Sequence, residues 1–385
     1  MNLLHCISAG LLVAMVSCNP AASKRAETDN NDKQDTLMII KNLNIDVTAA
    51  ENIEPGLDCG VSGAFTGVLG GRMIQAGGCN FPEDPLGAAS KKKFYEGIYA
   101  VETGDSTWQP VRIGTLPKAM AYGVAVTYPE GMVLIGGSDA SGSFSEVYSL
   151  KMEGDATRIE CLPSLPGTID NFAATEIDST IYVAGGSYNG QPSNKVFKLD
   201  LKEKGSNWQE LAALPGNPRV QPVMAHGKDA EGNEALYLWG GFAGKGEGRD
   251  ASLNTDGLKF DFAKGEWKQI ASPENQEGEA VSTGGGCITV LPDGRIAEVG
   301  GVNKDIFLEA LQNQAPDYLT HPIEWYRFNP NLLIFDPTSE KWSVGLVSKE
   351  IARAGAGIVS LDGCIMVAGG ELKPRIRTAV ITVIK

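Results

Sequence analysis

Short apolar stretches that end in two glycines recur along the chain. Each consists of four mostly apolar residues followed by Gly-Gly, at residues 73–78, 132–137, 181–186, 236–241, 296–301 and 365–370. Successive pairs are separated by 59, 49, 55, 60 and 69 residues. A sandwich would have closer and less regular spacing, so the pattern predicts a repeated supersecondary unit of about 50 residues.

Each unit has further features in common. A tryptophan follows most Gly-Gly pairs after another apolar strand, at Trp108, Trp208, Trp267 and Trp342. A stretch rich in glycine and alanine then leads to the next Gly-Gly strand. This order predicts four strands per unit, with glycines where the backbone is crowded near an axis and tryptophans between neighbouring sheets. The sequence therefore predicts an all-β fold, a six-bladed kelch-type β-propeller over residues 37–385.

The ends of the chain indicate how the ring closes. Only one strand, residues 379–385, follows the last Gly-Gly pair, whereas an additional extended segment, residues 37–49, precedes the first unit. We expect the N-terminal segment to be the outermost strand of the sheet whose other three strands come from the C-terminus. Sharing one sheet would lock the ring and leave no long open edge.

The first 36 residues have a different composition. An apolar run at residues 7–16 ends in Ser17-Cys18, and a polar tract follows. This pattern is typical of a bacterial lipobox, which predicts a signal peptide at residues 1–18, lipidation of Cys18 and a polar linker at 19–36. The domain would then be lipid-anchored to a bacterial membrane, in the periplasm or cell envelope. Because residues 1–5 lack Lys and Arg, plain secretion and a soluble cytoplasmic protein remain alternatives.

Composition narrows the possible ligands. The net charge is −14, which argues against binding to nucleic acid or to an anionic membrane surface.

Five cysteines follow Cys18, at Cys59, Cys79, Cys161, Cys287 and Cys364. Cys59 and Cys79 could form a disulfide, although small buried residues are the simpler interpretation. The cysteines and histidines lack metal-ligand spacing, so we expect no metal site.

The predicted topology brings two sets of loops to one face of the ring. The residues directly after Gly-Gly belong to one set, and only the last of them, Glu371, is a carboxylate. The loops between units carry Arg219 and Arg353, and Arg377 follows Glu371 closely. A carboxylate among arginines suits an anionic sugar, because the guanidinium group can bind a carboxylate through two hydrogen bonds. Alternatively, Glu371 pairs only with Lys373, Arg375 or Arg377, and Arg219 and Arg353 are structural.

Several segments resemble a known family. Residues 369–378 resemble the segment around the catalytic glutamate of bacterial N-acetylneuraminate epimerases, the kelch-type sialic acid mutarotases. Residues 121–124, 214–221, 300–307 and 332–342 are similar to further motifs of that family. The segments occur here in a different order, which resembles a cyclically permuted branch. One departure is Met120, at a position where the family motif has arginine.

The resemblance implies a reaction and a site. The family converts N-acetylneuraminate between its α and β anomers, with Glu371 as the group that accepts and donates the proton. For this reaction Arg219, Arg353 and Arg377 are the candidate ligands of the sugar carboxylate, and Asn303 is the candidate ligand of a hydroxyl or acetamido group. The implied reaction needs no metal, nucleotide or redox cofactor. The predicted membrane attachment is only through the N-terminal lipid.

Other functions are less compatible with the sequence. A copper-radical kelch oxidase needs histidine ligands, and the chain has three histidines, one of them in the predicted leader. A sialidase needs repeated Asp-box turns, which residues 103–108 do not match. A surface lipoprotein that binds glycans without chemistry, or a kelch interaction scaffold, stays open. The insertion at residues 304–330 is either a helical lid, with its helix at 306–314, or a surface loop.

Overall fold

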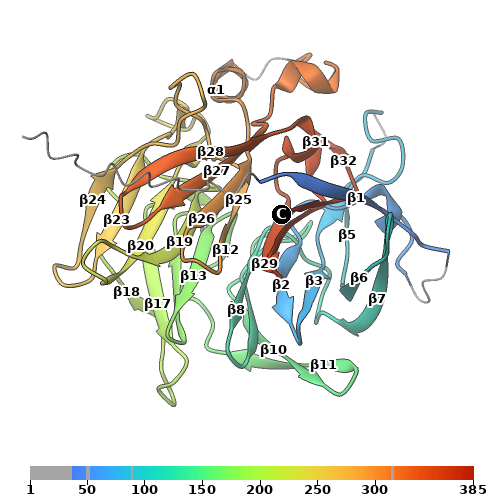
Figure 1. Ribbon diagram of the computed structural model, residues 1–385, viewed down its shortest axis with the longest axis horizontal. Coiled ribbons are helices and arrows are strands. Elements are labelled where there is room, and N and C mark those ends of the chain that lie inside the picture. Colours follow the sequence, from blue (N-terminus) through green and yellow to red (C-terminus); the bar gives the residue numbers. More distant parts are fainter. Residues whose placement is uncertain (1–36, 49–52, 88–89, 314–315) are drawn as a thin grey trace, which may run out of the picture. The chain divides into compact units, whose positions relative to one another are not determined.

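Strands that end at or just before a pair of glycines recur through the described part of the chain (Figure 1). The computed structural model describes residues 37–48, 53–87, 90–313 and 316–385. The predicted signal peptide, Cys18 and the linker up to residue 36 lie outside these residues. The Gly-Gly strands predicted from sequence are β3 (Arg72–Ala76), β9 (Gly131–Ile135), β14 (Thr180–Ala184), β20 (Glu234–Trp239), β26 (Ile296–Gly300) and β30 (Cys364–Ala368).

Each of these strands is the second strand of an antiparallel group of four. Four groups are separate sheets: β8 (Val124–Tyr128), β9, β10 (Val147–Glu153) and β11 (Ala156–Leu162); β13 (Ala173–Ile177), β14, β17 (Val196–Asp200) and β18 (Gln209–Glu210); β19 (Val223–Lys228), β20, β23 (Gly257–Asp261) and β24 (Glu266–Ile270); and β25 (Gly286–Val290), β26, β27 (Asn331–Asp336) and β28 (Lys341–Val347). The remaining large sheet has eight strands in the order β2 (Phe65–Leu69), β3, β6 (Gly97–Thr103), β7 (Thr107–Thr115), β1 (Ile39–Ile45), β33 (Ile381–Ile384), β30 and β29 (Gly357–Leu361).

The eight-stranded sheet joins the two ends of the chain. Strand β1 pairs antiparallel with β33, with Leu43 opposite Ile381, and it touches β7 in parallel over two residues. Within the part of the chain that is described, the order β29, β30, β33, β1 makes a four-stranded group whose outermost strand is N-terminal. This arrangement confirms the predicted closure, and Figure 1 shows the C-terminus beside β1.

The first strands of the groups contact one another in a closed circuit. Strand β2 contacts β8, followed in turn by β13, β19, β25, β29 and again β2. Neighbouring groups are also joined at the outside by indole N–H groups, which donate to backbone carbonyls of the preceding group. These bonds are Trp108 to Ala379, Trp208 to Pro163, Trp267 to Ala212 and Trp342 to Ala271. The predicted placement of the tryptophans between sheets is therefore confirmed.

A ring of backbone hydrogen bonds connects the loops that lead into the first strands. Tyr122 donates to Gly63, Asn171 to Tyr122, Gln221 to Asn171, Gly285 to Gln221, Gly355 to Gly285 and Gly63 to Gly355, over 2.6–3.3 Å. Within the described residues, all members of this backbone ring have φ between 52° and 73°. The left-handed conformation costs a glycine little but strains other residues.

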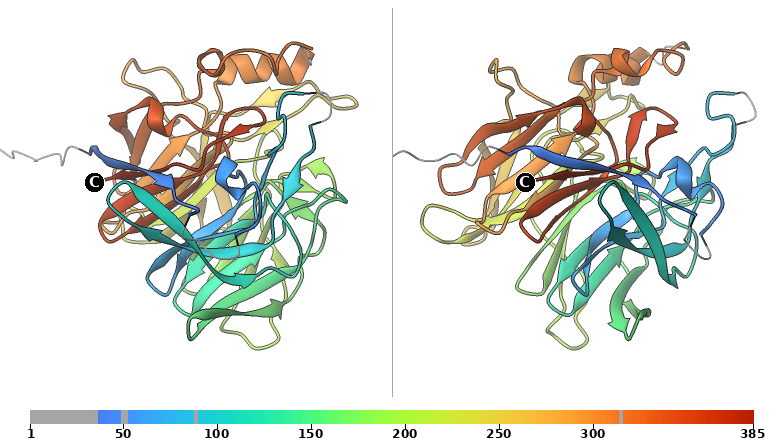
Figure 2. Two further views of the ribbon diagram at one scale, coloured as in Figure 1. Left: turned by 90° about the vertical axis from the view of Figure 1, so that its right-hand side faces the viewer. Right: turned by 45° about the vertical axis from the view of Figure 1, so that its right-hand side comes forward.

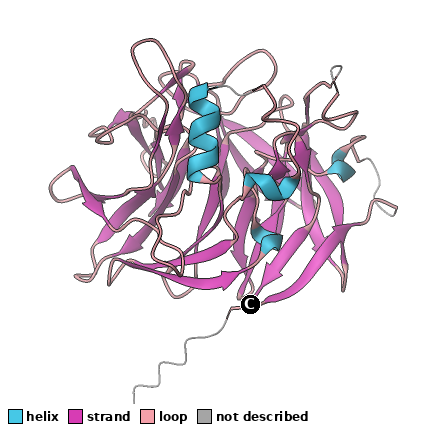
Figure 3. Cartoon of the chain, turned by 90° about the horizontal axis from the view of Figure 1, so that it is seen from above, coloured by secondary structure: helices cyan, strands magenta, loops and turns pink. Residues whose placement is uncertain are grey.

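Short elements cover one side of the sheets (Figures 2 and 3). They are β4 (Cys79–Asn80) with β5 (Lys93–Phe94), β12 (Ile169–Asp170) with β15 (Ser187–Tyr188) and β16 (Gln191–Pro192), β21 (Phe242–Ala243) with β22 (Ser252–Leu253), β31 (Glu371–Lys373) with β32 (Ile376–Arg377), α1 (Lys304–Asn313), and the 3-10 helices η1 (Leu57–Cys59), η2 (Ile323–Tyr326) and η3 (Lys349–Ile351). Helix α1 confirms the predicted helix in the insertion, two residues earlier at its start. No helix among the described residues is long and apolar enough to cross a membrane.

The cysteines of the described residues are all free. Cys59 is exposed, whereas the Sγ atom of buried Cys79 donates a hydrogen bond to Tyr122 Oη at 3.0 Å. The disulfide considered from the sequence is therefore not formed, and the Cys79 side chain instead belongs to the hydrogen bonding around Tyr122.

Candidate active site

The hairpin of β31 and β32 begins directly after the last Gly-Gly pair. Gly370 has φ 93°, and a Cβ atom there would lie 2.9 Å from Ala356 Cβ, so only glycine fits this close approach. The next residue, Glu371, exchanges two backbone hydrogen bonds with Ala354, at 2.7 and 3.0 Å. These bonds fix the start of the hairpin against the loop that leads into β29.

Glu371 and Arg377 pair across this hairpin. Arg377 Nη2 lies 2.5 Å from Glu371 Oε1, and the two residues are opposite one another in the strand register. The Arg377 side chain is only 2% exposed, whereas 23% of the Glu371 side chain remains exposed. Within the described residues, Arg377 Nε and Nη1 are buried and have no hydrogen-bond partner. Unpaired donors in a buried guanidinium group cost free energy unless a ligand fills them.

Further cationic and aromatic groups surround the pair. The Phe81 ring lies beneath the guanidinium groups of Arg375 and Arg377, at 5.3 and 5.4 Å from its centroid. Lys92 Nζ lies 5.8 Å from the same centroid and donates to Tyr122 Oη at 3.1 Å. Positive charge is therefore concentrated here, although the chain as a whole is acidic.

The environment of Glu371 changes its proton affinity. Burial raises the pKa of the Glu371 carboxyl, and the positive charges of Arg377 and Lys92 lower it in part. The pKa remains above its ordinary value, because removal from water disfavours the carboxylate more than the two cations favour it. A carboxyl group with a raised pKa can both accept and donate a proton near neutrality.

The structure places the other predicted arginines in internal roles. The Arg219 side chain is 1% exposed, binds both carboxylate oxygens of Asp256 at 2.8 and 2.7 Å, and donates to Gly240 O. Arg353 is also buried, and its donors contact the carbonyls of Glu350, Val367, Gly369 and Val380 and the hydroxyl of Thr382. These contacts do not bring either guanidinium group to Glu371, and they support the structural alternative over substrate binding.

Asn303 has a local partner as well. Its Oδ1 atom accepts hydrogen bonds from the backbone N–H groups of Asp305 and Ile306, at 3.2 and 3.1 Å. Such a side chain caps the start of a helix, here α1. The contact differs from the predicted role in binding a hydroxyl or acetamido group.

The insertion after β26 packs against the hairpin that carries Glu371. Buried Lys373 donates from Nζ to the carbonyls of Leu319 and His321, at 3.2 and 2.6 Å. Tyr318 lies close enough that the Glu371 charge adds to the effect of burial in raising the pKa of its phenol. The part of the insertion around η2 therefore borders the site, as a lid would.

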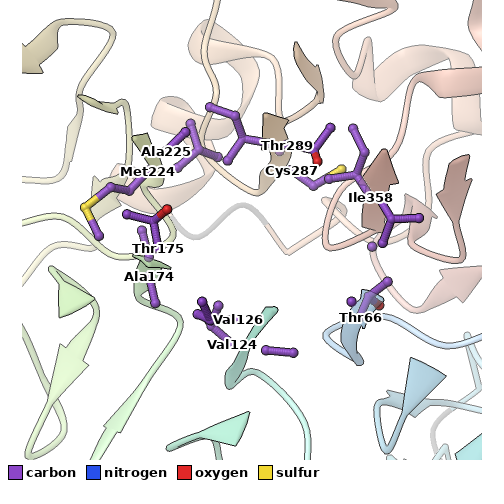
Figure 4. A pocket seen from close by; sticks show the side chains of 18 of the residues that line it. Thr66, Val124, Val126, Ala174, Thr175, Met224, Ala225, Cys287, Thr289 and Ile358 are labelled. Carbon is purple, nitrogen blue, oxygen red and sulfur yellow. The ribbon is translucent and has the colours of Figure 1, made fainter. Parts of the chain in front are cut away.

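A separate cavity of about 590 Å³ lies along the first strands (Figure 4). Its walls are mainly small and aliphatic, with Val126, Ala174, Ala225 and Ile358 among them. The members of the backbone ring also line it, but Glu371 and Arg377 do not. This cavity lacks the cations that an anionic sugar requires, so we place the candidate site at the Glu371–Arg377 pair instead.

The sequence prediction missed several neighbours of Glu371. Lys92, Phe81 and Tyr318 come from segments distant in sequence, and only tertiary contacts bring them together. One signal was available, because Lys91, Lys92 and Lys93 form a cationic run in an acidic chain. Within the described residues, no group of three or more His, Cys, Asp or Glu side chains is placed to hold a metal ion.

Comparisons with known proteins identify similar sequences. The sequence profile described as N-acetylneuraminate epimerase matches residues 41–159 and 162–385. The N-acetylneuraminate epimerase of Yersinia pestis (strain Pestoides F) is 30% identical over 252 residues, which cover 58% of this chain and 57% of that protein. The N-acetylneuraminate epimerase of Escherichia coli O1:K1 / APEC is 30% identical over 240 residues, 59% of this chain and 61% of that protein.

A solved structure titled "Structure of YjhT" is also similar. It is 29% identical, covers 56% of this chain and 62% of that chain, and has a TM-score of 0.47. The matches to the two curated relatives span 57% and 61% of their length. The profile, in contrast, matches nearly all of residues 41–385, and this chain therefore belongs to the N-acetylneuraminate epimerase family.

Proposed function

We propose that this protein is a sialic acid mutarotase, an isomerase that interconverts the α and β anomers of N-acetylneuraminate. The observation that carries the proposal is the contact between Glu371 and Arg377, in which a part-exposed carboxylate faces a guanidinium group with two unused buried donors. A guanidinium group beside a part-exposed carboxyl suits a sugar acid, because arginine forms strong charge-assisted hydrogen bonds with carboxylates. Membership of the epimerase family supports the same substrate.

The reaction requires one proton to leave and another to arrive. Glu371 accepts the proton of the anomeric hydroxyl, the bond between the anomeric carbon and the ring oxygen breaks, and the ring oxygen gains a proton. Rotation about the C2–C3 bond and ring closure then produce the other anomer. The raised pKa of Glu371 suits it for both directions, and Arg377 holds the sugar carboxylate in place.

We further propose a six-bladed kelch-type propeller with a permuted order of blades. The closed circuit of first strands and the backbone ring support six blades. A permuted order also accounts for the partial coverage, because an alignment that follows both chains in one direction cannot join segments that occur in opposite order. A closed ring tolerates such a change, since its termini can lie at any sheet.

The cellular location is a separate proposal. We propose that Cys18 is lipidated and tethers the domain to a bacterial membrane, with the catalytic part in the periplasm or cell envelope. The support is the apolar run that ends in Ser17-Cys18. Metabolic labelling with a radioactive fatty acid should label the full chain but not Cys18→Ser, and equal labelling of both would refute the proposal.

The activity can be tested by proton NMR of freshly released α-N-acetylneuraminate. The wild-type protein should accelerate the appearance of the β anomer, whereas Glu371→Gln should abolish the acceleration. The control is Glu153→Gln, which changes an exposed glutamate at the end of β10 and should keep the wild-type rate. Binding of the sugar without acceleration by the wild-type protein would instead identify a glycan-binding protein and overturn the proposed activity.

A further inference from the structure

Tyr122 occupies a strained position beside the candidate site. Its φ is 61°, which is unusual for an aromatic residue, whereas three members of the backbone ring are glycines, Gly63, Gly285 and Gly355. The strain accompanies a tight contact, because a Cβ atom at Gly63 would lie 2.7 Å from Tyr122 Cδ1. Strained residues that persist in a folded protein often serve its function, since the rest of the structure must hold them in place.

The strained backbone directs the Tyr122 hydroxyl toward two donors. Cys79 Sγ donates to Tyr122 Oη at 3.0 Å, and Lys92 Nζ donates to it at 3.1 Å. A phenolic oxygen accepts two hydrogen bonds and donates one. Among the described residues the acceptor in contact with the Tyr122 hydroxyl is the Cys79 sulfur, which accepts only weakly. A ligand oxygen is a stronger acceptor and can take that hydrogen bond instead.

The same hydroxyl lies in the electrostatic field of the catalytic pair. Burial raises the pKa of Tyr122 well above its ordinary value, Cys79 and Glu371 raise it further, and Arg377 lowers it. The phenol thus keeps its proton when Glu371 is ionised. Lys92 acts on both groups, because it contacts Tyr122 Oη and also lowers the pKa of Glu371.

We propose that Tyr122 is a second proton-transfer residue, which serves the ring oxygen while Glu371 serves the anomeric hydroxyl. The inference rests on the proposed mutarotase activity and divides its two proton transfers between two side chains. Anomerisation requires both transfers, and Glu371 Oε1 is held by Arg377, which leaves the other carboxylate oxygen for one of them. Tyr122, in the loop before β8, and Glu371, on the hairpin of β31 and β32, would then serve one oxygen each.

Each side chain ends the reaction in the protonation state in which it began. Glu371 takes the proton of the anomeric hydroxyl, whose oxygen becomes the carbonyl oxygen as the bond between the anomeric carbon and the ring oxygen breaks. The departing ring oxygen takes the proton of Tyr122 Oη, and the Lys92 ammonium group stabilises the resulting phenolate by its hydrogen bond. After rotation, the phenolate removes that proton again as the oxygen attacks the carbonyl carbon, and Glu371 returns its proton to the carbonyl oxygen.

The first test compares Tyr122→Phe with the wild-type protein in the NMR assay. Phenylalanine keeps the ring and the backbone conformation, so thermal unfolding should be nearly unchanged, while kcat should fall about 100-fold or more with little change in KM. The matched control is Tyr128→Phe, which removes a hydroxyl that contacts Ser149 outside the site and should keep the wild-type kcat. Wild-type kcat in Tyr122→Phe would refute the role of Tyr122.

A second variant tests proton transfer if Tyr122→Phe folds poorly. Replacing Tyr122 with 3-fluorotyrosine makes the phenol more acidic and leaves its shape nearly unchanged. If the phenol donates its proton to the departing ring oxygen, kcat at a fixed pH should change with the acidity of the phenol, whereas a purely structural hydroxyl would leave kcat at the wild-type value and refute the proposal. A wild-type protein without any acceleration would refute the proposed function itself, so the two failures are distinguishable.

Discussion

Arg377 Nη2 lies 2.5 Å from Glu371 Oε1, across a hairpin whose turn is only two residues long. The contact links substrate binding to proton transfer, because one guanidinium group faces the base and has further donors that remain unused. A sugar carboxylate that binds this guanidinium group would sit beside the carboxyl group that accepts the anomeric proton. The following predictions depend on this pair and on the buried groups behind it.

The acid limb of kcat/KM should lie above the ordinary pKa of a glutamate. Burial raises the pKa of Glu371, and the group accepts a proton only as the carboxylate, so activity should fall as the pH decreases through this raised value. Arg377 lowers the pKa, so Arg377→Gln should move the acid limb to still higher pH, in addition to raising KM. A pH profile of kcat/KM measures both effects.

The control for this shift is Lys304→Gln, which removes a part-exposed cation whose carboxylate partner is Asp305 rather than Glu371. Its acid limb should coincide with that of the wild-type protein. If the limb of Arg377→Gln stayed in place or moved to lower pH, Arg377 would not stabilise the ionised form of Glu371, and the geometry of the pair would need revision.

Arg353→Ala should reduce stability more than substrate binding. The substitution leaves several buried carbonyls without a donor, which should lower the free energy of unfolding by roughly 3 kcal/mol. The KM of the folded fraction should remain near the wild-type value. Urea denaturation and steady-state kinetics test the two parts separately. A strong increase in KM at unchanged stability would restore the role in substrate binding that the sequence suggested.

Glu298 should make the protein less stable as the pH rises. Its side chain is fully buried in β26, and within the described residues neither carboxylate oxygen has a hydrogen-bond partner. Burial raises the pKa of Glu298 well above its ordinary value. The folded state therefore binds the proton more tightly than the unfolded state, and the free energy of unfolding should fall once the pH exceeds the unfolded pKa of about 4.3.

Glu298→Gln removes this titration and should flatten the decline. The difference between the two proteins should grow by about 1.4 kcal/mol for each pH unit between the unfolded and folded pKa values. Urea denaturation across a pH series measures it, with the exposed Glu102→Gln as the control. An equal dependence on pH in wild type and Glu298→Gln would mean that Glu298 finds a partner in solution.

Much of the fold could be predicted because it depends on local patterns. Gly-Gly after an apolar strand marks the second strand of each group, and the unmatched strands at the two ends predicted the pairing of β1 with β33. The nearness of Glu371 to Arg377 was also local, since a tight hairpin brings residues six apart into register. Arg219 and Arg353 differ, because the direction of their guanidinium groups depends on acceptors such as Asp256 and Val380 that no short-range pattern indicates.

The sequence by itself determined the repeated strands, the closure of the ring and the position of Glu371 at the start of the last hairpin. Only the tertiary structure decided which groups surround that glutamate: Lys92, Tyr122 and Tyr318 come from three other segments. The physical reason is the range of the interactions. Strand and turn propensities act over a few residues, whereas charge and burial at Glu371 depend on loops that meet only when the ring of sheets closes.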